Sequence, residues 1–257
     1  MSAKQFEIIY GINTVYEIIK NKANSIEHVY FLRDSNSSRH NKIRQLSIES
    51  NIQTSNLEKK DFFSKLSSRF DSDSNYVINH QGVIALCEPS EIFDEFFLKS
   101  LIKKSKEKIL LLILDEITDP HNLGACLRSA DASGVDAVII PKNNSVGLTG
   151  TVRKVACGAA ETIPLVVVKN LSRLIGDLKK EGIWVIGATG EAEKDIYQID
   201  FTGHTALVLG AEGKGMRRLT KENCDELFSI PIVGTVESLN VSVATGVALY
   251  EVLRQRR

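Results

Sequence analysis

A regular alternation of apolar runs and helical segments between residues 109 and 257 is the feature that most constrains how this chain can fold. The first run, Ile109 to Leu114 (ILLLIL), is continuously apolar, which is typical of a buried strand in a parallel sheet. Further apolar runs lie at residues 135–140, 165–168, 183–188, 206–209 and 227–231. Because helical segments alternate with these runs, the sequence predicts an α/β domain built on a parallel sheet.

The ends of the predicted helices carry residues with suitable conformational preferences. Asp119 suits the N-cap of the first helix and Pro120 its first position, while Gly134 suits its end. A later helix, over residues 171–181, is expected to stop at Gly182. The remaining helices of this region are predicted at residues 152–157 and 241–254.

Residues 1–88 form a separate αβ unit that precedes this domain. Apolar residues recur at helical spacing between Ile12 and Ile19. A unit of about 85 residues can bury a core of its own. The remaining elements are β-like runs at 28–32, 52–54 and 82–87, helical segments at 43–49 and 61–66, and a polar loop at 67–75.

Residues 89–108 are rich in charge and show helical periodicity in FDEFFLKSLIKK. We interpret them as a linker that includes a helix. Two arrangements stay open, because the helix can pack against the following domain or belong to a flexible hinge. The predicted domains are therefore residues 1–88, the linker 89–108, and residues 109–257.

Composition limits the classes of protein to consider. No apolar run approaches the roughly 18 residues that span a bilayer, and the N-terminus lacks a signal-peptide pattern, so we expect a cytoplasmic protein without a membrane partner. The cysteines are scattered without a CxxC pair, which indicates reduced thiols and no metal site. With 32 basic and 32 acidic residues the net charge is zero, so any RNA contact must come from local patches such as Arg39 to Arg44.

The stretch Leu207 to Thr245 carries the clearest indication of a ligand site. Two apolar runs each lead into a glycine-containing loop, and open α/β sheets bind ligands at the carboxyl ends of their strands. The polar residues Glu212, Ser238 and Asn240 lie in these loops. The segment GAEGKGM is not a P-loop, because a glycine follows its lysine where serine or threonine is required. Its position late in the domain also argues against a dinucleotide-binding fingerprint.

Two further polar residues follow the first strand of the domain. Asn122 and Arg128 are six positions apart, so they do not share a helical face. We expect Asn122 at the start of the helix and Arg128 deeper in it. Taken alone, an arginine there is usually an ion-pair partner, with a catalytic or phosphate-clamping role as the alternative.

Three segments together resemble the motifs of the SpoU/TrmH ribose 2′-O-methyltransferases. They are TDPHNLGACLRSADASG, LVLGAEGKGMRR and SIPIVGTVESLNVSVATGVALYE, in the family's order and spacing. The text RKVACGAAE at Arg153 to Glu161 also resembles the family. In residues 1–87, YGINTVYEII and NHQGVIAL resemble the ribosomal-protein-like RNA-binding domain of the members that act on 23S ribosomal RNA.

The resemblance implies methyl transfer from S-adenosyl-L-methionine to the ribose 2′-hydroxyl of a guanosine in 23S ribosomal RNA. Methylation of transfer RNA and a non-catalytic RNA-binding assembly factor are the alternatives. The resemblance further implies a parallel-sheet SPOUT domain with a deep trefoil knot, a homodimer, and no metal.

Site residues follow from the resemblance by position. It implies that the cofactor lies against Leu209, Gly210, Gly215, Ile230 and Leu239, and that the catalytic set is Asn122, Arg128, Glu212, Ser238 and Asn240. Because the pKa of arginine lies above roughly 12, we expect Arg128 to clamp the target phosphate and stabilise developing negative charge, with action as a general base as the alternative. Glu212, Ser238 and Asn240 are expected to orient Arg128, the ribose and the cofactor loop.

Overall fold

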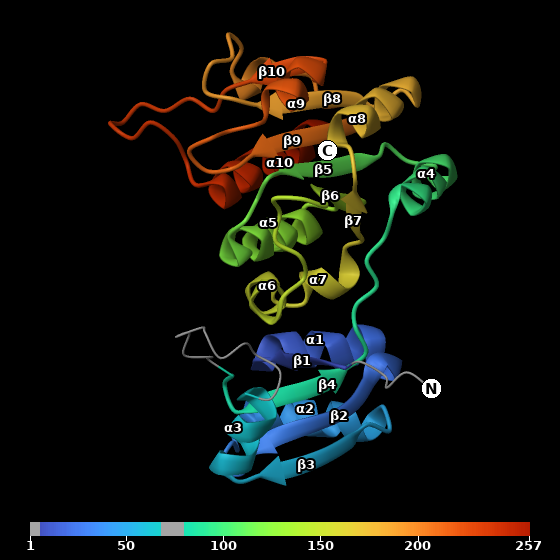
Figure 1. Ribbon diagram of the computed structural model, residues 1–257, viewed down its shortest axis with the longest axis vertical. Coiled ribbons are helices and arrows are strands. Elements are labelled where there is room, and N and C mark those ends of the chain that lie inside the picture. Colours follow the sequence, from blue (N-terminus) through green and yellow to red (C-terminus); the bar gives the residue numbers. More distant parts are fainter. Residues whose placement is uncertain (1–5, 68–79) are drawn as a thin grey trace. The chain divides into compact units, whose positions relative to one another are not determined.

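The computed structural model describes residues 6–67 and 80–257, which form two compact units (Figure 1). Unit 1 comprises the described residues up to Glu91 together with Arg153–Thr162. Unit 2 comprises Ile92–Val152 and Ile163–Arg257. The division expected from sequence assigned the segment 153–162 to the C-terminal domain and set residues 89–108 apart as a linker, most of which belongs to unit 2. Most of the predicted loop at 67–75 lies outside the described residues.

Unit 1 is built on a four-stranded mixed sheet with the strand order β1-β4-β2-β3. Strand β4 pairs antiparallel with both β1 and β2, and β3 pairs parallel with β2. The predicted helices and strands of this unit are present, and β1 is an additional strand. The elements are β1 (Glu7–Tyr10), α1 (Ile12–Lys22), η1 (Ala23–Ser25), β2 (Ile26–Leu32), α2 (Ser38–Glu49), β3 (Gln53–Leu57), α3 (Lys59–Ser67) and β4 (Val83–Cys87).

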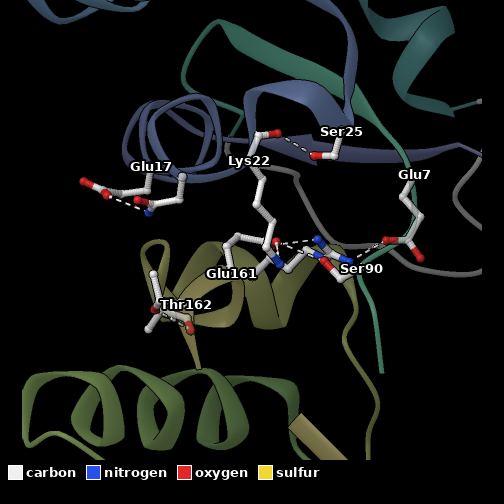
Figure 2. A network of polar contacts seen from close by, with 10 residues as sticks. Glu7, Glu17, Lys22, Ser25, Ser90, Glu161 and Thr162 are labelled. Carbon is white, nitrogen blue, oxygen red and sulfur yellow. Dashed lines mark hydrogen bonds and ion pairs between the residues drawn. The ribbon is translucent and has the colours of Figure 1, made fainter. Parts of the chain in front are cut away.

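A buried ion-pair cluster holds the segment 153–162 within unit 1 (Figure 2). The Arg153 guanidinium, 2% exposed, donates to Glu161 at 2.6 Å and to Glu7 at 2.7 Å. The second oxygen of Glu161 accepts from Lys22 Nζ at 3.3 Å and from Ser90 Oγ at 3.0 Å. The segment is carried by α6 (Gly150–Ala156) and α7 (Ala159–Thr162).

Unit 2 is built on a six-stranded parallel sheet with the strand order β10-β8-β9-β5-β6-β7. This confirms the prediction of a parallel α/β domain preceded by a smaller αβ unit. Strand β10 is shorter than the predicted 227–231, and Pro231 at the end of that run has no N–H to donate to a sheet. The strands are β5 (Leu110–Asp115), β6 (Ala137–Pro141), β7 (Leu165–Val168), β8 (Trp184–Ala188), β9 (Thr205–Gly210) and β10 (Glu226–Phe228).

The helices of unit 2 begin and end where their capping residues predict. The Asp119 side chain accepts from the backbone N–H of His121 at the start of α5. Gly134 and Gly182, which follow α5 and α8, take positive φ angles of 74° and 78°. Within the described ranges no helix is long and apolar enough to cross a membrane. The elements are α4 (Glu95–Lys104), α5 (Pro120–Ala132), α8 (Leu171–Lys180), η2 (Ile196–Gln198), α9 (Arg218–Asn223) and α10 (Val241–Arg256).

Helix α4 resolves the alternatives left open for residues 89–108. Leu98 is completely buried in the core of unit 2, and Phe93 and Phe97 pack against the same core. Phe93 also forms a bridge with Val166 of the edge strand β7. The helix of the predicted linker therefore packs on the parallel sheet instead of belonging to a free hinge.

The four cysteines are free thiols, and burial sets the reactivity of three of them. Burial raises the pKa of Cys126 to about 11 and those of Cys87 and Cys224 to about 12. At pH 8 we expect iodoacetamide to label these three at least about a hundredfold more slowly than a free thiol, measured by mass spectrometry. Denatured protein is the control for the labelling, and equal labelling before and after denaturation would contradict the prediction.

Because the pKa values of these three thiols are raised in the folded state, their contribution to stability is complete below about pH 8.5. It falls as the pH rises towards 11 to 12.

Candidate active site

A cleft of about 410 Å³ opens at the carboxyl ends of β8 and β9. Its position agrees with the general rule for ligand sites in open α/β sheets. All five residues expected to bind the cofactor line it: Leu209, Gly210, Gly215, Ile230 and Leu239. Residues not anticipated from sequence complete the lining, among them Thr189, Glu191, Glu237 and Ala244.

The glycine-rich loop after β9 is closed by its own backbone. Ala211 and Gly215 exchange two hydrogen bonds, at 3.1 and 2.8 Å. Gly213 and Gly215 take positive φ angles of 77° and 67°, which glycine adopts readily. A Cβ on Gly210 would lie 2.0 Å from the carbonyl carbon of Gly215, so no side chain fits there. The loop conformation therefore requires its glycines.

Three of the five predicted catalytic residues meet in one hydrogen-bond network. Asn240 is the N-cap of α10, and its Oδ1 accepts from the backbone N–H and hydroxyl of Ser242, at 2.9 and 2.6 Å. These bonds fix the amide orientation. The Nδ2 group of Asn240 donates to Asn122 Oδ1 at 3.0 Å and to Glu212 Oε2 at 3.1 Å. Asn122 completes the ring by donating to the same Glu212 oxygen at 3.3 Å.

The remaining predicted catalytic residues lie near this network in different ways. Ser238 lines the cleft together with Glu212. Arg128 lies on the exposed side of α5, six residues beyond Asn122. Among the described residues it belongs neither to the cleft lining nor to the hydrogen bonds of the network. The structure therefore brings Asn122, Glu212 and Asn240 together, places Ser238 at the cleft, and leaves Arg128 further along its helix.

Two ionic features of the site were missed by the sequence analysis. Asp115, fully buried at the end of β5, accepts from the backbone N–H of Arg217 at 3.0 Å and from its Nε at 2.8 Å. This bond anchors the chain just beyond the glycine-rich loop. An acidic residue directly after a continuous apolar strand is a signal that could have pointed to it. At the cleft, a hydrogen bond and the positive charge from Lys221 lower the pKa of Glu191, which favours its carboxylate form.

The fold and the cleft define a parallel α/β domain with a small-molecule site at the carboxyl edge of its sheet. Residues 109–250 match the model of the SpoU rRNA Methylase family, and residues 8–93 match the model described as RNA 2′-O ribose methyltransferase substrate binding. The chain belongs to the SpoU rRNA methylase family.

Individual relatives cover nearly the whole chain. It is 47% identical to the 23S rRNA (guanosine-2′-O-)-methyltransferase RlmB of Pseudomonas syringae pv. tomato over 98% of this chain and 97% of that protein. It is also 47% identical to the RlmB protein of Escherichia coli K12, over 97% and 99% of the two chains. In fold it resembles the crystal structure of the SpoU methyltransferase AviRb from Streptomyces viridochromogenes in complex with the cofactor AdoMet. That likeness has a TM-score of 0.75 at 22% identity and covers 98% of this chain and 90% of AviRb.

Proposed function

We propose that this protein transfers a methyl group from S-adenosyl-L-methionine to the ribose 2′-hydroxyl of a guanosine in 23S ribosomal RNA. The observation that carries the proposal is the 47% identity over nearly the full length of proteins with that named activity. The match of residues 8–93 to a substrate-binding model supports a role for unit 1 in holding the RNA. Because the substrate is ribosomal RNA, we place the protein in the cytoplasm.

The cleft suits the proposed cofactor in size and chemistry. A volume of about 410 Å³ lies in the range of small-molecule sites. Leu209, Ile230 and Leu239 offer an apolar wall for a flat adenine ring. The carboxylates of Glu191 and Glu237 suit a ligand that carries positive charge. When bound, S-adenosyl-L-methionine supplies a methyl group on a sulfonium centre, which an oxygen nucleophile can accept directly.

The hydrogen-bond network can position the ribose that accepts the methyl group. Both amide donors of the network point to Oε2 of Glu212, and Oε1 has no partner in the part of the chain that the structure describes. We assign Oε1 to a hydrogen bond from a hydroxyl of the bound ribose. Orientation of the reacting groups can contribute about 7–11 kcal/mol to lowering a barrier. In this proposal Arg128 clamps the target phosphate and Ser238 helps to hold the cofactor loop.

Incubation with radiolabelled S-adenosyl-L-methionine and separate RNA pools tests the function. We expect label in an unmodified 23S ribosomal RNA transcript, recovered as 2′-O-methylguanosine after nuclease digestion. Label in transfer RNA alone would overturn the proposed substrate. Bound cofactor without transfer to any RNA would favour a binding protein instead.

Gly210→Ala is expected to weaken cofactor binding by at least about tenfold, since an inserted methyl group costs about 1–3 kcal/mol when the surroundings cannot yield. The clash is with backbone atoms of Gly215 and Met216, which form the loop itself. Calorimetric titration with S-adenosyl-L-methionine gives the affinity. Gly234→Ala, where a Cβ meets nothing within 4 Å, is the matched control. Equal affinities for the two variants would contradict the prediction.

We also propose that the protein acts as a homodimer through α10. Val243 and Tyr250 are 51% and 54% exposed and lie seven residues apart, on one face of this helix. An exposed apolar stripe of this kind is typical of a contact surface.

We also propose that unit 2 contains a trefoil knot. It is supported by the crossing of the chain from the central β9 to the edge strand β10 and back to α10, which packs on α5.

The double variant Val243→Glu/Tyr250→Glu is expected to be monomeric, because it places two like charges on the proposed contact. Light scattering should give the mass of two chains for the wild type and of one chain for the variant. Ile48→Glu, which changes an exposed apolar residue of α2 in unit 1, serves as the control and should stay dimeric. A monomeric wild type would contradict the proposed dimer.

A further inference from the structure

A second cavity of unit 2 is lined by cations and lies outside the cofactor cleft. It has a volume of about 390 Å³ and lies where β7 leads into α8, beside the start of α9. Its polar lining comes from Lys169, Asn170, Ser172, Arg217, Arg218 and Thr220. Among the described residues no acidic side chain lines it. The lining therefore carries three positive charges, of which that of Arg217 is paired with Asp115.

Part of this charge is available to a ligand. Lys169 is exposed and makes no ion pair within the described ranges of the chain. Arg218 is exposed, and its ion pair among the described residues is with the exposed Glu222 one turn further along α9. Backbone N–H groups at the start of the ten-residue helix α8 add a partial positive charge. Cations of this kind favour an anion with several oxygens, of which phosphate is the best match.

The cavity is held in a fixed position relative to the glycine-rich loop. Its Arg217 is anchored by Asp115, through Nε at 2.8 Å and Nη2 at 2.6 Å. Arg217 follows Gly215, which lines the cofactor cleft, by two residues. Both sites therefore lie beyond the carboxyl ends of strands of the same sheet, the cleft at β8 and β9 and the cavity at β7.

We propose that this cavity binds a backbone phosphate of the RNA substrate, at a nucleotide other than the one that is methylated. The inference rests on the proposed function, which supplies RNA as the ligand. The lining of the cavity contains no aromatic side chain among the described residues on which a base could stack. It thus contributes to affinity and orientation of the RNA without reading its sequence.

The test is the double variant Lys169→Ala/Arg218→Ala in the full chain, which leaves the Arg217–Asp115 contact intact. Binding to an unmodified 23S ribosomal RNA transcript is measured by filter binding over a series of salt concentrations. We expect the dissociation constant to rise about tenfold and the slope of log K against log salt to decrease by about one. The KM for RNA should rise in parallel, while kcat at saturating RNA and the affinity for S-adenosyl-L-methionine should stay within about twofold.

Lys103→Ala/Lys104→Ala, which removes two exposed charges from the last turn of α4, is the control and should keep the wild-type slope. Equal salt slopes for the wild type and the Lys169/Arg218 variant would overturn the proposal. It would also be overturned if the variant lost affinity for inorganic phosphate, measured by calorimetry, but not for RNA, since the cavity would then serve a free anion. The binding measurement does not depend on methyl transfer, so failure of the proposed function would show separately, as absence of methylation by the wild type.

Discussion

Arg128→Lys is expected to lower the rate of methyl transfer by about 10²–10³-fold, the usual loss when one preorganised donor is removed from developing negative charge. Lysine keeps the positive charge, but it cannot present two parallel N–H groups to a phosphate or an oxyanion. Arg128 is outside the lining of the cofactor cleft, so the affinity for S-adenosyl-L-methionine should not change. Single-turnover kinetics with labelled cofactor and a 23S ribosomal RNA transcript measure the rate, and calorimetry measures the affinity.

Arg173→Lys is the matched control for this substitution. Arg173 is an exposed arginine of unit 2 whose ion pair is with Glu95 of α4, away from the cleft lining. The control should transfer methyl groups within about twofold of the wild-type rate, since exposed ion pairs contribute little. Undiminished turnover by Arg128→Lys would show that the guanidinium has no special role in the reaction.

The parallel sheet of unit 2 could be predicted because its strands are continuously apolar. All six residues of β5 are buried and the first five, Leu110 to Leu114, are apolar, so the strand has no exposed polar face. Capping residues such as Asp119 and Gly134 then mark the helix ends. Strand β1 was missed because it has only four residues and leads through Gly11 directly into α1.

The cofactor cleft was more predictable than the polar network beside it. Strands β8 and β9 end at one edge of the sheet, so loops that follow them converge without any knowledge of side-chain contacts. The hydrogen bonds of Asn122 with Glu212 and Asn240 instead join residues 90 and 118 positions apart. Only the family resemblance joined Asn122 to Glu212 and Asn240, because spacing along the chain carries no information on such pairs.

The segment 153–162 shows a different limit of sequence analysis. Its helical character was predicted at residues 152–157, but periodicity gives the buried face of a helix and not the domain that covers it. Arg153 looks like a surface residue in the sequence, yet it is almost fully buried beside Glu161. A buried arginine needs a carboxylate partner, and its second partner, Glu7, lies 146 residues earlier in the chain.

Arg153→Met is expected to reduce the stability of unit 1 by up to about 3–5 kcal/mol, because removing one partner of a buried ion pair leaves the other charge poorly compensated. Methionine roughly keeps the volume, so the main loss is electrostatic. Glu161, whose side chain is 1% exposed, would keep Lys22 and Ser90 as its partners in the described part of the chain. The single tryptophan, Trp184, lies in β8 of unit 2, so its fluorescence does not report on unit 1. Native-state hydrogen exchange at the amides of β2 and β4 gives the stability of unit 1 directly.

A second substitution separates loss of packing from loss of charge balance. Arg153→Met/Glu161→Gln removes both charges of the pair, so it should be clearly more stable than Arg153→Met alone, since a neutral amide tolerates burial better than an unpaired carboxylate. Arg33→Met, which breaks the exposed ion pair with Glu58 in the same unit, should change stability by less than about 1 kcal/mol. If the double variant were no more stable than Arg153→Met, the contribution of Arg153 would come from packing, and the ion-pair cluster would not be what holds residues 153–162 in unit 1.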